Sequence, residues 1–332
     1  MPVTIQDIAD KLKLSNSTVS RVLNNKGHEF ISDATRQRVL TAVREMGYRP
    51  NPAARALVQK RTDTIALWIP RPHASYYAQL VYQVTTAMNN SGLDVITKEV
   101  GLKDDVEIGH IERFFRFPVD GILACDADSS VARYQQTFPD TETPIVGMGC
   151  YYLPSHDYVA IDNSATAREA VLHLRDVGCR RIAHLLAFSS NHVGEWRRDA
   201  YQQVMDEQRI PCELIVCSEM SRLSARTSLT AYLHTHGCPD GLFCHNDDMA
   251  IGAYRALCDL GYHVPRDVAL IGCDGIIEIE YLETPLSTIV QPTEEMCRLA
   301  CLYLKQRIDN ATLPPQQCTL ASHLALRAST RR

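Results

Sequence analysis

Paired cysteines are absent from this sequence. None of the twelve cysteines lies before Cys125, and no two are separated by two residues. Their neighbours are apolar, as in "LFCHN" and "RLACLYL", which is typical of small buried side chains in a reducing compartment. The stretch "LHTHGCPDGLFCHN" has enough donors for zinc, but its spacing fits no standard finger, and a helix running into a buried strand explains it. Zinc there would use His234, His236, Cys238, Cys244 and His245. We expect no metal ion and no cofactor.

Long apolar runs and catalytic loop motifs are also missing. The stretch "MPVTIQDIADKLKL" is charged and amphipathic, and no run approaches the roughly 18 apolar residues of a membrane span. We therefore expect a cytoplasmic protein. The chain has no Walker loop, no G-x-S-x-G elbow and no G-x-G-x-x-G, since "GMGC" at 147–150 lacks the third glycine. An enzyme acting on sugars or nucleotides is the disfavoured alternative.

Acidic residues are scarce at the N-terminal end alone. Residues 1–62 hold 11 Lys and Arg against 5 Asp and Glu, a net charge of +6, whereas the rest of the chain carries −11, which makes −5 in total. A basic module on an acidic body indicates a polyanionic partner that contacts only one part of the molecule. A solvated run of charge is the alternative, but these cations are spread through patterned helices.

Three short helices are expected in residues 4–47. The first, in "TIQDIADKLKL", begins at Thr4, with Asp7 completing a capping box. The second follows Ser15, and the third follows Ser32 and ends at Gly47. A tight turn between the first two makes a helix-turn-helix unit. The inward faces are Ile5, Ile8, Ala9 and Leu12 in the first helix, Val19, Val22 and Leu23 in the second, and Val39, Leu40, Val43 and Met46 in the third.

The second helix carries the residues expected to contact DNA. Its outward side chains are small hydrogen-bonding groups and one arginine, which can approach base edges or fork onto a guanine, whereas acid there would repel the phosphates. A bundle used for protein contact would need an exposed apolar face, which is missing, so double-stranded DNA is the predicted partner. The outward residues are Asn16, Ser17, Thr18, Ser20 and Arg21.

The segment after the third helix points to a family. Pro50 and Pro52 stop the helix, and "PAARALVQK" is a helix former of only about two turns, too short to be stable alone. Over its full length the chain resembles the LacI/GalR family of bacterial transcription factors. The resemblance is carried by "TIQDIADKLKLSNSTVSRVLN", "TRQRVLTAVREMGYRPNPAARALVQKRT", "CHNDDMAIGAYRAL", "VALIGCDG" and "TPLSTIVQP".

The resemblance implies that residues 50–61 form a hinge helix that orders on operator DNA and wedges a leucine into the minor groove. The matching residue is Leu57, and its alternative role is to pack on its own core. Bases would be read mainly by the two residues after the capping serine and by the arginine of the second helix. The set expected at the DNA is Thr4, Ser15, Asn16, Ser17, Thr18, Ser20, Arg21, Asn24, Thr35, Asn51, Ala54, Arg55 and Leu57.

From residue 62 onward, apolar strands alternate with amphipathic helices, as in "TIALWIP", "YYAQLVYQVTTAMNNSG" and "LDVITKEV". This alternation predicts parallel sheets with helices on both faces, and about 270 residues of it exceed one common domain. The expected architecture is an all-α helix-turn-helix domain (1–49), the hinge helix (50–61) and an α/β two-lobed core (62–332) like that of periplasmic binding proteins. Lobe 1 is about 62–161 and 291–320, and lobe 2 is about 162–290 and 321–332.

Ligands of such sheets bind at the carboxyl ends of strands, so the polar residues after "WIP", "LFC" and "LIGC" are candidates, with helix capping as their alternative role. Arg71 stands where the family commonly has an acid, and Gly275 replaces an acid or amide. A cation at that position makes a sugar acid or a sugar phosphate a candidate effector in addition to a neutral sugar. The stretch "SYYA" resembles that of the purine repressor, so a nucleobase stays an alternative. Completed by the resemblance, the expected effector site is Arg71, His73, Tyr76, Tyr77, Arg197, Asn246 and Asp274.

These inferences predict a sequence-specific transcriptional regulator, a repressor, that binds an inverted-repeat operator as a homodimer. An effector in the cleft would rotate the lobe nearer the DNA, move the hinge helices and change operator affinity. The tail "HLALRASTRR" contains no leucine heptads, so no tetramer is expected. A periplasmic sugar-binding protein, the remaining alternative, would share the two lobes but carry a secretion signal in place of the basic module.

Overall fold

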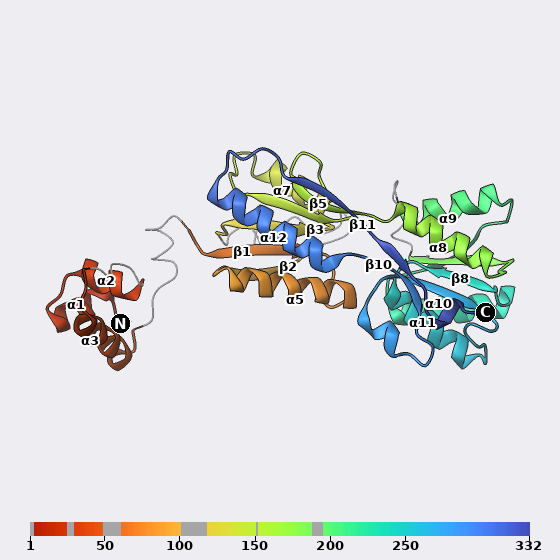
Figure 1. Cartoon of the computed structure of the whole chain (residues 1–332), viewed down its shortest axis with the longest axis horizontal. Coiled ribbons are helices and arrows are strands. Elements are labelled where there is room, and N and C mark those ends of the chain that lie inside the picture. Colours follow the sequence, from red (N-terminus) through yellow and green to blue (C-terminus); the bar gives the residue numbers. More distant parts are fainter. Residues whose placement is uncertain (1–2, 25–29, 49–60, 101–117, 151, 188–194) are drawn as a thin grey trace. The chain divides into compact units, whose positions relative to one another are not determined.

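The computed structural model describes residues 3–24, 30–48, 61–100, 118–150, 152–187 and 195–332. The chain divides into two compact units, Met1–Thr62 and Asp63–Arg332 (Figure 1). No helix in the described ranges combines the length and the apolar character that crossing a bilayer requires.

The described residues of the first unit form three helices whose ends are capped as the sequence predicts. Helix α1 spans Ile5–Leu12, α2 spans Asn16–Leu23 and α3 spans Asp33–Met46. The Thr4 hydroxyl accepts the amide of Asp7 at 3.3 Å, while the Asp7 carboxylate accepts the amide of Thr4 at 2.8 Å, which completes the capping box. Ser15 and Ser32 cap α2 and α3, and Gly47 ends α3 in the left-handed region with φ +64°.

The core of this unit is small and differs from the prediction on α3. Ala42, which the apolar stripe did not include, is buried, whereas Leu40, Val43 and Met46 are only partly buried. A bundle of three short helices encloses too little volume to cover several large side chains completely, so a small residue takes the closest position. The fully buried set is Ile8, Ala9, Val19, Val22, Val39 and Ala42.

The second unit contains two six-stranded sheets built as the alternating pattern predicts. The first has the order β11-β5-β4-β3-β1-β2 and the second β12-β10-β9-β8-β6-β7. Their pairs are parallel except that β12 runs antiparallel to β10, a strand direction that the prediction of parallel sheets missed. The first sheet comprises β1 (Thr64–Ile69), β2 (Asp94–Glu99), β3 (Gly121–Cys125), β4 (Ile145–Gly149), β5 (Asp157–Asp162) and β11 (Gln317–Ala321). The second comprises β6 (Ile182–Ala187), β7 (Glu213–Cys217), β8 (Gly241–Cys244), β9 (Ala269–Asp274), β10 (Ser287–Val290) and β12 (His323–Ala325).

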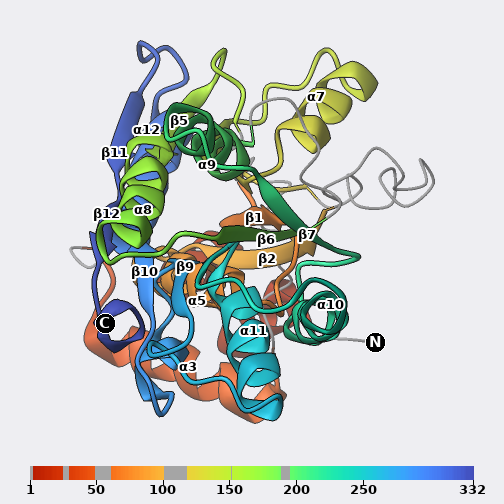
Figure 2. The same cartoon turned by 90° about the vertical axis from the view of Figure 1, so that its right-hand side faces the viewer.

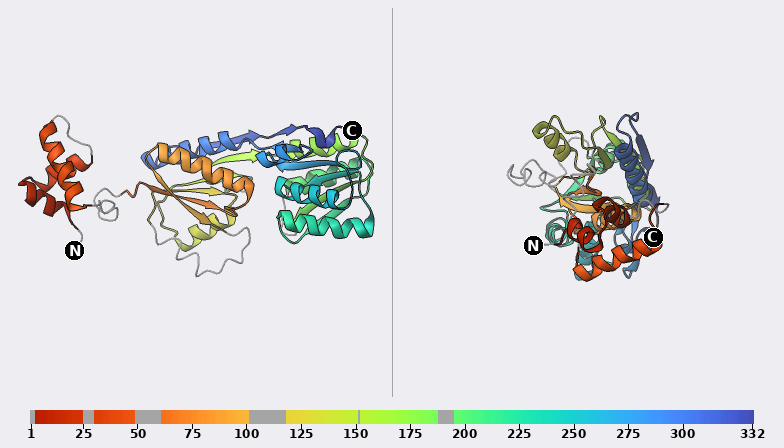
Figure 3. Two further views of the ribbon diagram at one scale, coloured as in Figure 1. Left: turned by 90° about the horizontal axis from the view of Figure 1, so that it is seen from below. Right: turned by 90° about the vertical axis from the view of Figure 1, so that its left-hand side faces the viewer.

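Alternate residues of the first sheet face different helices. In β1, Ile65, Leu67 and Ile69 pack in the cluster that includes α5 (Ser75–Asn90) and α12 (Thr293–Asp309), whereas Ala66 and Trp68 pack with α7 (Asp128–Thr137). Because side chains alternate along a strand, both faces of the sheet are apolar and covered. Figure 3 (left) shows the orange helix α5 on one face and the yellow helix α7 on the other.

The second sheet is covered in the same manner. Helices α8 (Ser164–Asp176) and α9 (Trp196–Glu207) share one buried cluster with Phe243 and Ile271. Helices α10 (Arg222–His236) and α11 (Asp247–Asp259) pack with Leu242 and Leu270 on the opposite face, as Figure 2 shows. Short 3-10 turns, η2 (Ile277–Tyr281) and η3 (Ala328–Thr330), follow β9 and β12. The chain passes between the sheets after β5, after β10 and after β11.

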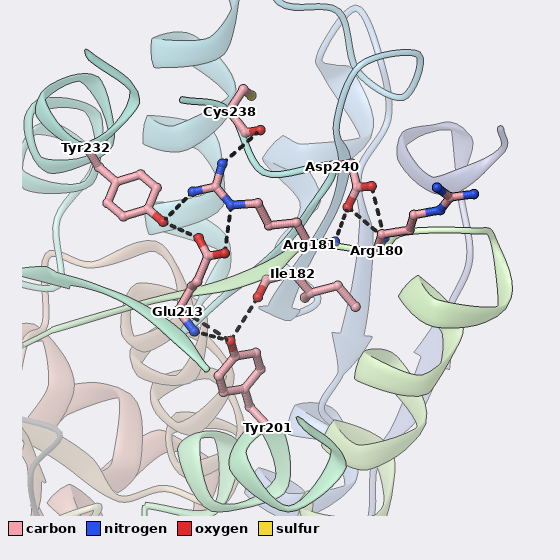
Figure 4. A network of polar contacts seen from close by, with 8 residues as sticks. All are labelled: Arg180, Arg181, Ile182, Tyr201, Glu213, Tyr232, Cys238 and Asp240. Atoms are coloured by element: carbon pink, nitrogen blue, oxygen red, sulfur yellow. Dashed lines mark hydrogen bonds and ion pairs between the residues drawn. The ribbon is translucent and has the colours of Figure 1, made fainter. Parts of the chain in front are cut away.

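A polar network ties the amino ends of β6, β7 and β8 together (Figure 4). The guanidinium of Arg181 donates to Glu213 at 2.7 Å and to the Tyr232 hydroxyl at 3.1 Å. The carboxylate of Asp240 accepts the backbone amide of Arg181 at 2.8 Å, and the Tyr201 hydroxyl donates to the Ile182 carbonyl at 2.9 Å. These bonds hold the amino ends of three strands in register, so the positions of their opposite, carboxyl ends are set as well.

Candidate functional site

Helix α2 presents an exposed polar surface without acid. Asn16, Ser17 and Arg21 are exposed, whereas Thr18, Ser20 and Asn24 are half-buried. The Ser15 hydroxyl accepts the Thr18 amide at 3.1 Å and lies 2.8 Å from the Ser17 hydroxyl, so the cap also orders the first turn. The first turn of this helix and its short side chains therefore suit a phosphate backbone and base edges.

The other residues expected at the DNA differ in surroundings. Asn24 donates from its amide to the Ser20 carbonyl at 2.9 Å, and the hydroxyls of Thr35 and Ser32 are 3.0 Å apart at the start of α3. Asn16 donates to the Gln6 side chain. Thr4 is exposed within the capping box of α1. The predictions for Asn51, Ala54, Arg55 and Leu57 lie outside the described residues.

A cavity lies between the carboxyl ends of strands from both sheets of the second unit. Its volume is about 60 Å³, well below that of typical small-molecule pockets, so a ligand of sugar size requires the lobes or the lining side chains to move apart. Six predicted effector residues line it: Arg71, Tyr76, Tyr77, Arg197, Asn246 and Asp274. The seventh, His73, lines a wider neighbouring cavity of about 770 Å³ that shares Arg71 with the first.

Five polar lining residues are not in the predicted effector set: Asp126, Cys150, His245, Asp248 and Gln291. Asp126 follows β3, Cys150 follows β4, His245 follows β8 and Gln291 follows β10. These four obey the rule that picked Asn246, because they are the first residues after buried strands. Applying that rule to the strands before Asp126, Cys150 and Gln291 would have found these three residues. His245 lies in the stretch after "LFC" that the rule had already selected, but it was not named there.

Two tyrosines and a carboxylate form the wall from the first sheet. The hydroxyl of Tyr76 donates to Gln291 at 3.3 Å, and that of Tyr77 donates to the Asp126 carboxylate at 3.2 Å. Burial and the nearby Asp126 raise the pKa of both tyrosines well above the ordinary value, so both remain hydroxyl donors. Asp126 also accepts the amide of Cys150 at 2.7 Å. At Gly149, with φ +102°, a Cβ would stand 2.4 Å from the Asp126 oxygen, so only glycine fits there.

Arg197 forms the buried cationic centre of the cavity. It is 8% exposed, donates to Glu195 at 3.3 Å and to Nε2 of His245 at 2.6 Å, and lies over the Trp196 ring at 4.1 Å. Burial, and next the charge of Arg197, lower the pKa of His245 well below its usual range, which keeps the imidazole neutral. The three side chains therefore form a unit in which Glu195 balances the charge of Arg197.

The second carboxyl group, Asp274, stands on a strained turn. The backbone φ of Asp274 is +130°, and the side-chain amide of Gln291 donates to the Asp274 carboxyl group at 2.8 Å. The turn is held by the buried Asp247, whose carboxylate accepts the amides of Gly275 at 2.7 Å and Ile276 at 3.0 Å. Burial, and next the charge of Asp247, raise the pKa of Asp274 well above its usual range, which favours the protonated acid as a donor.

Polar contacts cross between the lobes at the rim of the cavity. The Asp248 carboxylate accepts the Ser75 amide at 3.2 Å and hydroxyl at 3.1 Å, and it accepts from Arg222 at 2.7 Å. Arg71 donates to the Met220 carbonyl at 3.2 Å. Asn246 lies beside these contacts in the cavity lining, and its side-chain oxygen caps α11 by accepting the Met249 amide at 2.8 Å. Helix capping, its alternative role, therefore coexists with its place in the cavity lining.

The donors weighed for zinc have other surroundings. The ring of His236 stacks on Tyr232 at 4.6 Å, and His245 contacts Arg197. Across the described ranges, no three His, Cys, Asp or Glu side chains are grouped in a way that could hold a metal ion. The cavity instead combines neutral and charged donors with carboxyl acceptors and aromatic faces, a chemistry that suits a ligand with many hydroxyl groups.

Comparison with known proteins gives matches at both ends of the chain. A profile described as "Bacterial regulatory proteins, lacI family" matches residues 4–51, and one described as "Periplasmic binding protein-like domain" matches residues 171–330. The chain is 31% identical to the HTH-type transcriptional regulator DegA of Bacillus subtilis, over 89% of its own length and 88% of the relative's. It is 30% identical to a ribose operon repressor of Haemophilus influenzae over 92% of each.

A solved structure of similar fold is the complex of the transcriptional regulator CelR with cellobiose. It is 27% identical, with a TM-score of 0.68, over 98% of this chain and 99% of the other. The profile of the lacI family matches only the N-terminal part of the chain. The two relatives align with both units at 30% and 31% identity, so the family assignment holds for nearly the whole chain. We conclude that this chain belongs to the LacI family of bacterial transcriptional regulators.

Proposed function

We propose that this protein is a transcriptional repressor that binds an inverted-repeat operator as a homodimer, and that a neutral sugar bound between its lobes changes its affinity for that operator. The observation that carries this proposal is the cavity, which is lined by polar side chains from both sheets. The same chain also carries a capped helix-turn-helix unit. No catalytic step is assigned to it. Such a regulator acts where the chromosome lies, in the cytoplasm.

At the DNA, we assign direct base contacts to Asn16, Ser17 and Arg21, the exposed side chains of α2. Each helix-turn-helix unit of the dimer would read one half-site in the major groove. Ser15 and Thr18 form the N-cap bond of α2 and thereby orient this helix toward the DNA. Leu57 is proposed to wedge into the minor groove at the centre of the operator, with Ala54 and Arg55 beside it.

The charges of the cavity favour a neutral ligand over an anion. Arg197 is balanced by Glu195 at 3.3 Å, and Arg71 already donates to the Met220 carbonyl at 3.2 Å. The Asp126 carboxylate would repel a second anion, whereas it accepts hydroxyl protons well. The names of two relatives support a sugar, since one is a ribose operon repressor and the other binds cellobiose in its solved structure.

A nucleobase fits the aromatic wall less well. The rings of Tyr76 and Tyr77 meet edge to face, with centroids 5.1 Å apart and planes at 71°. A flat base is held best between parallel faces, whereas a sugar ring needs one aromatic face and several hydrogen bonds. Sugar acids, sugar phosphates and purines are therefore the competing classes in the test.

The coupling between the two sites follows from the lobes. A ligand can shift the protein only by the difference in its affinity for the two lobe arrangements. Hydroxyl groups that contact Asp126 of one lobe and Arg197 of the other are bound fully only when the lobes are held together. The lobe arrangement would then set the spacing of the paired hinge segments and, through them, operator affinity.

The proposal is tested by thermal shift with D-ribose, cellobiose, D-gluconate, ribose 5-phosphate and adenine, followed by operator titration with and without the ligand that stabilises the protein. We expect stabilisation by a neutral sugar and a change in operator affinity of 5-fold or more. Arg197→Ala should abolish the ligand response and retain operator binding, whereas Leu57→Ala should weaken operator binding and retain ligand binding. Stabilisation by the anions or adenine alone would overturn the sugar assignment, and operator affinity that no ligand alters would overturn the regulatory one.

A further inference from the structure

His245 is a buried histidine in the lining of the cavity that the family resemblance did not single out. It directly follows β8, is 2% exposed, and its backbone amide donates to the Leu185 carbonyl at 2.8 Å. It therefore stands on a rigid strand end, between the predicted effector residues Arg197 and Asn246. A side chain in that position is held precisely enough to select a ligand.

The contact between Arg197 and His245 fixes which imidazole nitrogen carries the proton. A guanidinium has only donors, so the 2.6 Å contact from Arg197 requires Nε2 of His245 to accept. A neutral imidazole that accepts at Nε2 carries its hydrogen on Nδ1. The charge of Arg197 next to the ring disfavours the doubly protonated form, which agrees with the lowered pKa of His245.

The resulting Nδ1–H group is buried and has no hydrogen-bonding partner among the described residues. A buried donor left without an acceptor destabilises a folded protein, so a donor of this kind on a residue that lines a cavity points to an acceptor on a bound ligand. The ring of His184 does not supply it. Nδ1 of His184 donates to the Phe243 carbonyl at 2.9 Å, so its Nε2 is an acceptor, but the two ring centroids are 6.5 Å apart and Nε2 has no hydrogen-bonding partner among the described residues.

We propose that His245 is a ligand-binding residue that determines specificity: its Nδ1–H donates to a hydroxyl oxygen of the effector, beside the guanidinium of Arg197. This proposal rests on the proposed function, since it concerns the same cavity. Because Glu195 already neutralises Arg197, the donor pair carries no net charge. It therefore selects a neutral oxygen acceptor, whereas Asp126 on the opposite wall selects a hydroxyl donor.

Two substitutions separate the two nitrogens. Asn places an amide near the position of Nδ1, so His245→Asn keeps a donor for the ligand and loses the contact with Arg197. Gln reaches the position of Nε2, so His245→Gln keeps an acceptor for Arg197 and loses the donor. His263→Gln, at an exposed histidine outside the cavity lining, controls for the chemical change.

The experiment is calorimetric titration of the full-length protein and these variants with D-ribose and cellobiose and with their monodeoxy analogues. We expect His245→Gln to weaken sugar binding about tenfold, the value of one buried hydrogen bond, and His245→Asn to weaken it less than about threefold. One monodeoxy analogue should bind the wild-type protein about tenfold more weakly than its parent, and that penalty should vanish in His245→Gln alone. A purely structural role of His245 would not remove the penalty at a single sugar position.

Other outcomes separate this proposal from the proposed function. If the sugars bind but every deoxy penalty persists in His245→Gln, the His245 assignment is overturned and the sugar-controlled repressor stands. If only D-gluconate or adenine binds, the sugar class fails, and the same variants titrated with that ligand decide the role of His245. If none of these binds, nitrogen NMR decides, since a proton on Nε2 of His245 overturns the assignment and one on Nδ1 supports it.

Discussion

Replacement of Asp247 by Ala should dismantle the turn that carries Asp274. Asp247 is fully buried at the start of α11, and three donors converge on its carboxylate. One oxygen accepts the amides of Gly275 and Ile276 at 2.7 and 3.0 Å, and the other accepts the Thr288 hydroxyl at 2.7 Å. The side chain thus connects α11 to β10 and to the turn after β9.

The magnitude follows from the groups left without partners. In Asp247→Ala, two backbone amides lose their acceptor at about 1–3 kcal/mol each, while the Thr288 hydroxyl can rotate toward another acceptor. We therefore expect a loss of about 4 kcal/mol in the free energy of unfolding. Asp247→Asn is the matched control, because its amide oxygen can accept both backbone amides and its NH₂ group can donate to Thr288. It should cost about 1 kcal/mol, the difference between bonds to a charged and to a neutral acceptor.

Urea unfolding followed by tryptophan fluorescence measures this loss. Both tryptophans, Trp68 and Trp196, lie in the second unit, so the signal reports the core without the helix-turn-helix unit. Ligand titration of the two variants then measures the effect on the turn that carries Asp274. A loss below about 1 kcal/mol in Asp247→Ala, or equal losses in both variants, would refute the reasoning that this carboxylate holds the turn.

Three further predictions concern the DNA-binding helix and the core. Ser15→Ala should lower the stability of the helix-turn-helix unit by about 1 kcal/mol in thermal unfolding, and Ser15→Asn should restore it; equal stability of all three proteins would contradict the cap. Arg21→Ala should weaken operator binding. If the arginine reads a base, Arg21→Lys should restore binding to scrambled DNA but not to the operator. Restored binding to both DNAs would indicate a phosphate contact alone. Burial lowers the pKa of His184 to about 4 from 6.5, so the unfolded chain binds the proton more tightly and stability should fall by about 3 kcal/mol between pH 6.5 and 4. His184→Asn can keep the bond to the Phe243 carbonyl without titrating, and an unchanged pH dependence of unfolding in this variant would sink the assignment.

Local chemistry made the helix boundaries of the first unit predictable. The capping box at Thr4, the caps at Ser15 and Ser32 and the left-handed Gly47 each depend on residues within four positions along the chain. Interactions of such short range are visible in sequence, because the helix brings together residues that are already near neighbours. The same holds for the strands of the core, whose apolar runs and following polar residues marked both the sheets and Asn246.

The contents of the cavity depended on contacts between distant segments. Asp126, Cys150, His245 and Gln291 come together because the strand order of each sheet differs from the order along the chain. His73, predicted from its place after the same strand as Tyr76, lines the wider outer cavity instead. Position after a strand indicates the edge of the sheet, whereas the direction of a side chain from that edge depends on the packing around it.

Caps, periodicity and charge act over a few residues, so the amino-acid sequence was enough to predict a basic, capped three-helix unit before an α/β core. The packing of the folded chain was needed to see that Arg197 contacts both Glu195 and His245 and that β12 runs antiparallel to β10. The contact with His245 and the direction of β12 both depend on segments that lie tens of residues apart in the chain. No pattern within one segment encodes such a contact, since it is the energy of the packed whole that selects it.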